Sequence, residues 1–167
     1  IDKYYKKIFF VFVPNVCDAQ CYFCYIEPSL SKGAAYSDSW LHKIETFISI
    51  SKQVGFNEFR FTGGEPLLFD NFAELVKIIS RQKVEYTLLT NGIRLNKHID
   101  CILSYRPKKI TISYHSKEKY EEIFGVSGDS SLMEATIKKL LQEDISIAIT
   151  ILLLPENIYE IISHIQY

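Results

Sequence analysis

The sequence has no apolar run that reaches the roughly 18 residues required by a membrane-spanning helix. Its longest run, residues 145–155, is interrupted by Ser146 and Thr150. It also has no excess of positive charge, because 19 lysine and arginine residues stand against 20 aspartate and glutamate residues. We therefore expect no membrane partner and no binding to a nucleic acid duplex, which needs a basic surface.

Glycine and proline are scarce, with seven and five residues, and no low-complexity tract or linker interrupts the chain. Hydrophobic residues make up 47% and charged residues 23% of the 167 positions, which is close to the globular average and argues against disorder. The length suits one domain, so we expect residues 1–167 to form a single unit.

Cysteine occurs only four times, and three of these residues, Cys17, Cys21 and Cys24, fall within eight positions. A disulfide framework more often spreads its cysteines across a shorter secreted chain. The clustering favours a metal site in a reducing compartment, so we expect a cytoplasmic protein. Cys101 stands alone beside Ile102 on the apolar side of a predicted helix, and we interpret it as a buried structural thiol.

Strand and helix patterns alternate along the whole chain. The predicted strands are residues 8–13, 58–62, 86–90, 109–113 and 145–154. Five helices are predicted, two of them at residues 37–54 and 95–103. Of the other three, one is capped by Asp70, one begins with a capping box at residues 131–134, and one has Pro155 in its first turn. Five such units imply a parallel sheet with right-handed crossovers. An open doubly wound sheet and a barrel or partial barrel both remain possible from periodicity alone.

Unusual residues follow the predicted strands at one edge of this sheet. The cysteines follow the first strand, and the later strands are followed or ended by Gly63, Gly64, Glu65, Asn91, Gly92, Ser113 and His115. In parallel α/β folds the loops at this edge carry the active site. Tight turns would explain glycine and asparagine, but not three cysteines and a carboxylate at the same edge. On the fourth strand, Thr111 and Ser113 should share the face opposite Ile110 and Ile112.

The spacing C-x-x-x-C-x-x-C places three thiolates on one short loop, which suits an iron–sulfur cluster or zinc. A structural zinc wants four ligands, and the nearest histidine, His42, lies eighteen positions beyond Cys24 on a predicted helix. A [4Fe–4S] cluster with three cysteines leaves one iron open to an outside ligand, so we favour it over zinc. Buried structural thiols fit less well, because Asp18 and Gln20 make the loop polar.

Residues 17–24, with the aromatic Phe23 before the last cysteine, resemble the signature of the radical S-adenosylmethionine (SAM) superfamily. Residues 62–67 (TGGEPL) resemble its GGE motif after the second strand, and residues 89–92 resemble the end of its third strand. Residues 120–125 are similar to the region after the fourth strand in the molybdenum-cofactor biosynthesis and peptide-maturase branches. The similarity extends over almost the whole chain, from Ile8 to about Glu160.

The resemblance implies a [4Fe–4S] cluster ligated by Cys17, Cys21 and Cys24. It implies SAM contacts from Phe23, Gly63, Gly64, Glu65, Asn91 and Ser113. In this interpretation the Gly63–Gly64 backbone and the Glu65 carboxylate meet the SAM ammonium, and Phe23 lies near the adenine. Asn91 and Ser113 could contact the ribose or the methionine carboxylate, although Asn91 could serve only its turn. His115 stands where many relatives have aspartate, so it could bind substrate, relay a proton, or simply bond to backbone.

The activity implied is reductive cleavage of SAM to a 5′-deoxyadenosyl radical that abstracts hydrogen from a nucleotide, a peptide or another small molecule. It implies an oxygen-sensitive enzyme and a one-electron reductant that is flavodoxin- or ferredoxin-like. The alternatives are a glycyl-radical-enzyme activase and a non-catalytic iron–sulfur or zinc sensor. The superfamily core is a partial (β/α) barrel of six units, and this chain offers five, so we expect a chain truncated at its C-terminus without the sixth strand.

Overall fold

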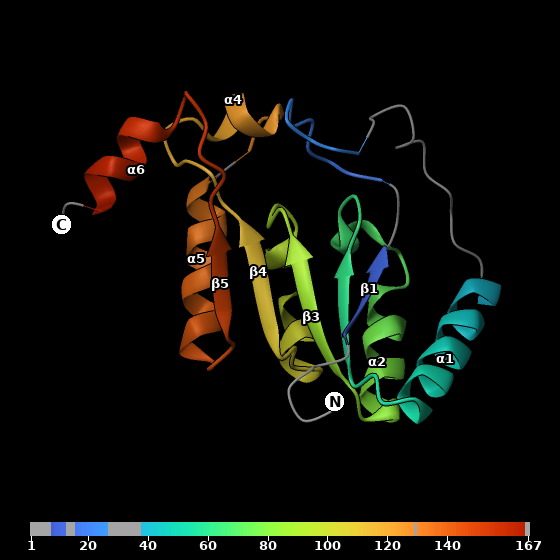
Figure 1. Ribbon diagram of the computed structural model, residues 1–167. Coiled ribbons are helices and arrows are strands. Elements are labelled where there is room, and N and C mark those ends of the chain that lie inside the picture. The colour runs from blue at the N-terminus through green and yellow to red at the C-terminus, as the bar shows by residue number, and fades with distance from the viewer. Residues whose placement is uncertain (1–7, 13–15, 27–37, 129, 166–167) are drawn as a thin grey trace, which may run out of the picture.

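The computed structural model describes residues 8–12, 16–26, 38–128 and 130–165. Its centre is one sheet of five parallel strands in the order β1-β2-β3-β4-β5 (Figure 1). The strands are β1 Ile8–Phe12, β2 Glu58–Thr62, β3 Glu85–Thr90, β4 Lys109–Ser113 and β5 Ile147–Thr150. A doubly wound sheet would require the strand order to reverse, whereas consecutive order is the arrangement of a barrel wall. The predicted α/β fold with a partial barrel is therefore confirmed, and the doubly wound alternative is wrong.

Helices and 3-10 turns fill the connections between these strands. Their bounds are α1 Asp38–Gln53, α2 Phe72–Gln82, α3 Ile99–Ser104, α4 Tyr120–Phe124, α5 Ser130–Gln142 and α6 Ile158–Ile165, with 3-10 turns at Pro66–Leu68 and Leu95–His98. Figure 1 shows α4 and the loop that follows β1 beyond the carboxyl ends of the strands. Within the described residues, no helix is long and apolar enough to cross a membrane.

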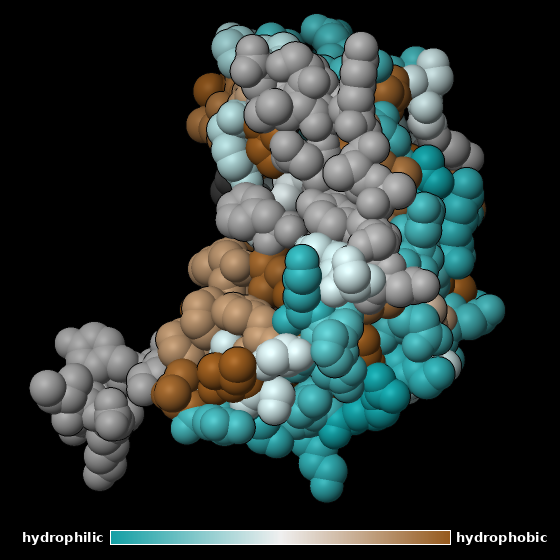
Figure 2. All heavy atoms as spheres, turned by 90° about the vertical axis from the view of Figure 1, so that its right-hand side faces the viewer, coloured by the Kyte–Doolittle hydropathy of each residue, from teal (hydrophilic) through white to brown (hydrophobic). Residues whose placement is uncertain are grey.

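The two faces of the sheet differ in burial. On β4, Ile110 and Ile112 have no exposed surface, whereas Thr111 and Ser113 are half-buried, which confirms that these pairs lie on opposite faces. The same alternation on β2 buries Phe59 and Phe61 completely. Figure 2 shows the molecule hollowed on one side, at the left, with hydrophobic side chains gathered below the hollow and hydrophilic side chains over the lower right.

The fifth strand is shorter than predicted: it ends at Thr150 rather than at Leu154. Side chains take the backbone groups that a longer strand would offer to a neighbour. The Leu152 amide donates to His115 Nδ1 at 3.0 Å, and the Leu154 amide donates to Asn157 Oδ1 at 2.9 Å. A continuous apolar run predicts a strand, but hydropathy carries no information on these distant hydrogen-bond partners.

Several helix starts also differ from the predictions. The residue before α2 is Asn71, not Asp70, and its side chain makes no capping hydrogen bond. Since α5 includes Ser130, Ser131 lies inside the helix and not before its first residue. Helix α6 begins three residues after Pro155, and the predicted helix 95–103 is a 3-10 turn followed by α3. The predicted boundaries at Val13 and Ser37 lie outside the described residues.

Candidate functional site

The cysteine loop, residues 16–26, is attached to neighbouring elements by backbone hydrogen bonds. The Glu65 amide donates to the Val16 carbonyl at 2.7 Å, and the Gln20 amide donates to the Phe124 carbonyl at 2.7 Å. Cys17 and Cys21 are half-buried, Cys24 is exposed, and none of the three is in a disulfide. The loop therefore lies between the turn after β2 and the short helix α4, at the carboxyl edge of the sheet.

Gly64 allows the turn after β2 to touch this loop. A Cβ atom at this position would lie 2.1 Å from the Val16 carbonyl oxygen and 2.5 Å from the Val16 carbonyl carbon. Both are backbone atoms, which cannot move aside as a flexible side chain can. Gly64 is thus required for close packing of one loop of the site against another, a reason that the sequence motif did not reveal.

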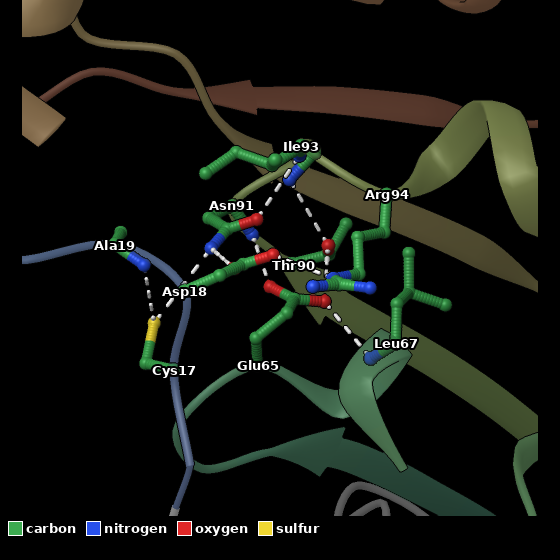
Figure 3. Close-up of polar contacts among 10 residues, drawn as sticks. Cys17, Asp18, Ala19, Glu65, Leu67, Thr90, Asn91, Ile93 and Arg94 are labelled. Carbon is green, nitrogen blue, oxygen red and sulfur yellow. Dashed lines mark hydrogen bonds and ion pairs between the residues drawn. The ribbon is translucent and has the colours of Figure 1, made fainter. Parts of the chain in front are cut away.

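Glu65 has no exposed surface, and its carboxylate accepts three hydrogen bonds from the chain (Figure 3). Oε1 accepts from the Leu67 amide at 2.9 Å and from the Thr90 hydroxyl at 2.7 Å, while Oε2 accepts from the Asn91 amide at 2.7 Å. Burial raises the pKa of Glu65 to about 7, although these bonds act in the opposite direction. The carboxylate therefore ties the turn after β2 to the end of β3, and its pairing with the SAM ammonium stays a prediction.

Asn91 connects the end of β3 to the cysteine loop (Figure 3). Its Nδ2 group donates to Asp18 Oδ1 at 2.9 Å and lies 3.7 Å from Cys17 Sγ, and its Oδ1 accepts from the Ile93 amide at 3.0 Å. Arg94 forms an ion pair with Asp18 at 2.6 Å. Asp18 lies between two predicted ligand cysteines, so these contacts control the course of the loop that carries them.

His115 is buried, with 6% of its surface exposed, at the end of β4. Its Nδ1 accepts the Leu152 amide, and its ring packs edge-to-face on Phe23 and stacks on Phe124. Burial lowers the pKa of His115, so the ring is neutral at pH 7, with its proton on Nε2 because Nδ1 is the acceptor. Of the predicted roles for His115, the structure shows the bond to backbone.

Comparison with known protein families assigns residues 11–167 of the chain to one of them, described as the Radical SAM superfamily. The chain belongs to the Radical SAM superfamily. Membership implies a [4Fe–4S] cluster and SAM as cofactors. It also confirms the superfamily resemblance that the sequence motifs indicated.

Individual relatives align with only part of this chain, and the alignment includes less than half of each relative. A "probable GTP 3′,8-cyclase" of Thermococcus kodakarensis is 28% identical over 120 residues, which are 71% of this chain and 38% of that protein. A GTP 3′,8-cyclase of Alkaliphilus metalliredigens is 30% identical over 134 residues, 78% of this chain and 42% of that protein. The chain thus spans about two fifths of the length of these curated relatives.

Solved structures share the fold at low sequence identity. Streptococcus suis SuiB bound to S-adenosylmethionine superposes with a TM-score of 0.73 at 17% identity, over 95% of this chain and 36% of that one. Native anSMEcpe with bound AdoMet and the Kp18Cys peptide also has a TM-score of 0.73, at 15% identity, over 97% of this chain and 48% of that one. At this identity the likeness establishes the fold alone.

The cysteine loop fits the cluster that a radical SAM protein requires. Burial raises the pKa of Cys17, and burial together with the nearby Cys17 and Cys24 thiols raises that of Cys21 to about 11. These thiols hold protons at neutral pH, which cluster assembly must displace. In the described part of the chain, no three Cys, His, Asp or Glu side chains are grouped to hold a single metal ion.

The structure brings most of the predicted site residues to one edge of the sheet. Asn91 contacts both Glu65 and Cys17, and Gly64 and Glu65 pack against Val16 at the start of the cysteine loop. Cys21 and Cys24 are joined to each other by a backbone hydrogen bond in that loop, and Phe23 packs on His115. Ser113 ends β4 beside Thr150 of β5, on the half-buried face. Sequence reasoning missed the contacts of Thr90 and Arg94. Thr90 lies in the motif 89–92 without an assigned role, no motif includes Arg94, and Asp18 was treated only as a polar loop residue. Cys101 is half-buried in α3, outside the cysteine loop.

Proposed function

We propose that this chain is the core domain of an enzyme that cleaves SAM reductively at a [4Fe–4S] cluster held by Cys17, Cys21 and Cys24. The observation that carries the proposal is the attachment of the cysteine loop to the turns after β2 and β3, at the sheet edge where parallel α/β folds bind ligands. When bound, the cluster and SAM supply a one-electron cleavage whose 5′-deoxyadenosyl radical abstracts hydrogen from a substrate.

The chain's own residues supply orientation and burial in this proposal. Asn91 and Arg94 hold Asp18, which sets the path of the loop and the direction of the Cys17 thiol. Gly63 and Gly64 present backbone at the same edge, and Phe23 and Ser113 are proposed to contact the nucleoside and methionine parts of SAM. Fixing the sulfonium against the cluster is the main requirement, because orientation governs the rate of such a reaction.

We propose a nucleotide as the substrate class, with a peptide as the second candidate. The nucleotide is supported by the GTP 3′,8-cyclases, which are 28–30% identical to this chain. The peptide rests on the resemblance of residues 120–125 to the peptide-maturase branch, because the likeness to anSMEcpe, at 15% identity, concerns the fold alone. The electron is proposed to come from a flavodoxin- or ferredoxin-like reductant.

Anaerobic reconstitution tests the cluster and the reaction together. We expect about four irons and four sulfides per chain, and formation of 5′-deoxyadenosine when SAM and a strong reductant are added. Replacing Cys17, Cys21 and Cys24 together by alanine should abolish both, while Cys101→Ala, the matched control, should retain both. Stoichiometric zinc without sulfide would contradict the cluster. A complete cluster that never cleaves SAM would instead support the sensor, and a radical that forms only on a partner protein's glycine would support the activase.

A further inference from the structure

The segment that follows β5, residues 151–157, is attached to the end of β4 by buried side chains. Asn157 has no exposed surface, and its Nδ2 group donates to the His115 carbonyl at 2.7 Å and to the Leu152 carbonyl at 2.8 Å. Its Oδ1 accepts the Leu154 amide at 2.9 Å, so its hydrogen-bonding capacity is well used. Together with the bond from the Leu152 amide to His115 Nδ1, these contacts lock the segment to His115 from two directions.

The same segment and the same histidine touch the cysteine loop. The Tyr22 hydroxyl donates to Glu156 Oε2 at 2.9 Å. The His115 ring lies 5.2 Å from the Phe23 ring at an interplanar angle of 84°, and 5.6 Å from the Phe124 ring at 19°. Phe23 lies between the predicted ligands Cys21 and Cys24, and Phe124 accepts the Gln20 amide through its carbonyl. The imidazole thus sits between the loop that carries the thiols and the segment after β5.

The geometry of the imidazole explains how it can hold Phe23 in place. The hydrogen bond from the Leu152 amide to Nδ1 allows only one orientation of the ring. Turning the ring by 180° would bring a carbon atom, Cδ2, to the place of Nδ1, and carbon cannot accept this bond. In that orientation the His115 and Phe23 rings form a T-shaped pair, an arrangement that aromatic pairs favour. A ring without the Leu152 contact would keep its stacking on Phe124 but lose the bond that fixes its rotation, so it would hold Phe23 less firmly.

We propose that His115 is a positioning residue that couples the segment 151–157 to the cysteine loop and holds Phe23 in place for SAM binding. The proposal rests on the proposed function, because it assumes that Phe23 contacts the SAM nucleoside. It assigns no proton transfer and no substrate contact to His115. The segment after β5 consequently acts on the SAM site through His115.

Two substitutions separate the contacts of His115. His115→Asn keeps an acceptor near the position of Nδ1 and removes the ring, whereas His115→Phe keeps the ring and removes the acceptor. His42→Asn is the matched control, because His42 is an exposed histidine on α1. The measurements are hydrogen exchange of the metal-free chain over residues 16–26 and 151–157, and SAM affinity of the cluster-loaded protein at matched iron content.

We expect His115→Asn to raise the SAM dissociation constant about threefold to tenfold, the effect of losing one aromatic pair, with cluster content unchanged. It should also speed exchange in residues 16–26. His115→Phe should speed exchange of the Leu152 amide and raise the dissociation constant less. His42→Asn should match the wild type in both measurements. If one of the His115 variants does not fold, the other still tests one of the two contacts, the ring pair with Phe23 or the hydrogen bond from Leu152.

Wild-type affinity and wild-type exchange in both His115 variants would overturn the proposal. So would wild-type SAM affinity with loss of product, because that result would place His115 on the substrate. Absence of SAM binding by the cluster-loaded wild type would instead overturn the proposed function. In that case, hydrogen exchange still decides the coupling: faster exchange in both segments supports it and unchanged exchange refutes it.

Discussion

At the residue scale, Glu65 is a carboxylate without exposed surface whose three hydrogen-bond donors come from two turns. Desolvation of such a group favours its neutral form, whereas the donors favour the charged form. Desolvation is the larger effect here, because it brings the pKa of Glu65 to about 7 from the ordinary 4.5. Glu65 is therefore a source of pH-dependent stability as well as a link between β2 and β3.

The stability of the metal-free chain should fall as pH rises through this range. The folded chain keeps the Glu65 proton up to about pH 7, whereas the unfolded chain releases it near pH 4.5, so the folded state binds more protons in between. Relative to Glu65→Gln, which lacks this titration, the wild type should lose about 3 kcal/mol of unfolding free energy between pH 4.5 and pH 8. Urea unfolding of both chains at several pH values measures the difference. Parallel profiles would show that Glu65 does not titrate in this range.

At the element scale, the turn after β2 and the segment after β5 both depend on single residues. Gly64 lets the turn approach Val16, and Asn157 satisfies three backbone groups of the segment and of the β4 end. Each residue controls a connection between elements that are distant in the chain, so each substitution should affect structure beyond its own loop.

Gly64→Ala should displace the cysteine loop. Its Cβ atom would overlap the Val16 carbonyl, so the two loops must separate, and we expect the iron content after reconstitution to fall by more than half. Gly55→Ala is the control, because Gly55 also has a positive φ, +92°, but lies in the turn after α1 and not beside the cysteine loop. That substitution should cost only about 1–2 kcal/mol of left-handed strain and retain the cluster. Iron and sulfide analysis of both variants makes the comparison, and equal loading would contradict the close approach.

Asn157→Ala should destabilise the chain by about 2–4 kcal/mol. It leaves the Leu154 amide and the carbonyls of His115 and Leu152 without this partner, and a buried unsatisfied polar group costs about 1–3 kcal/mol. Asn157→Asp restores the acceptor for Leu154 but places a carboxylate against two carbonyls, so it should be no better. Chemical denaturation measures both, and a loss below 1 kcal/mol would mean that water replaces the amide.

At the scale of the whole molecule, β5 lies at one edge of the described sheet, next to large apolar side chains that solvent reaches. Ile149, Ile151, Leu152 and Leu153 are 41–63% exposed. An apolar strand at a sheet edge offers unpaired backbone groups to another chain. Exposed apolar side chains on an edge strand therefore favour association between molecules. The exposed apolar residues of α1 do not offer such pairing, because the backbone groups of a helix are already paired.

The 167-residue chain should therefore associate in a concentration-dependent manner through β5. Ile149→Lys should shift sedimentation towards the monomer, because Ile149 is 44% exposed on β5 and a charge on the edge strand opposes pairing. Ile50→Lys provides the control, since Ile50 is 58% exposed on α1. A monomer at every concentration tested, or an equal effect of both lysines, would contradict association through this edge.

Local pattern was sufficient to predict the alternation of strands and helices, the parallel sheet and the inward and outward faces of β4, because hydrophobic period and turn residues are short-range properties. The three-cysteine loop and the GGE turn also predicted the superfamily, while the individual SAM contacts stay predictions. Tertiary structure decided the partners: Arg94 reaches Asp18 across 76 positions, and His115 reaches Leu152 across 37. It also decided the barrel order over a doubly wound sheet and the early end of β5. These features depend on burial and on hydrogen bonds between distant residues, which no local pattern encodes.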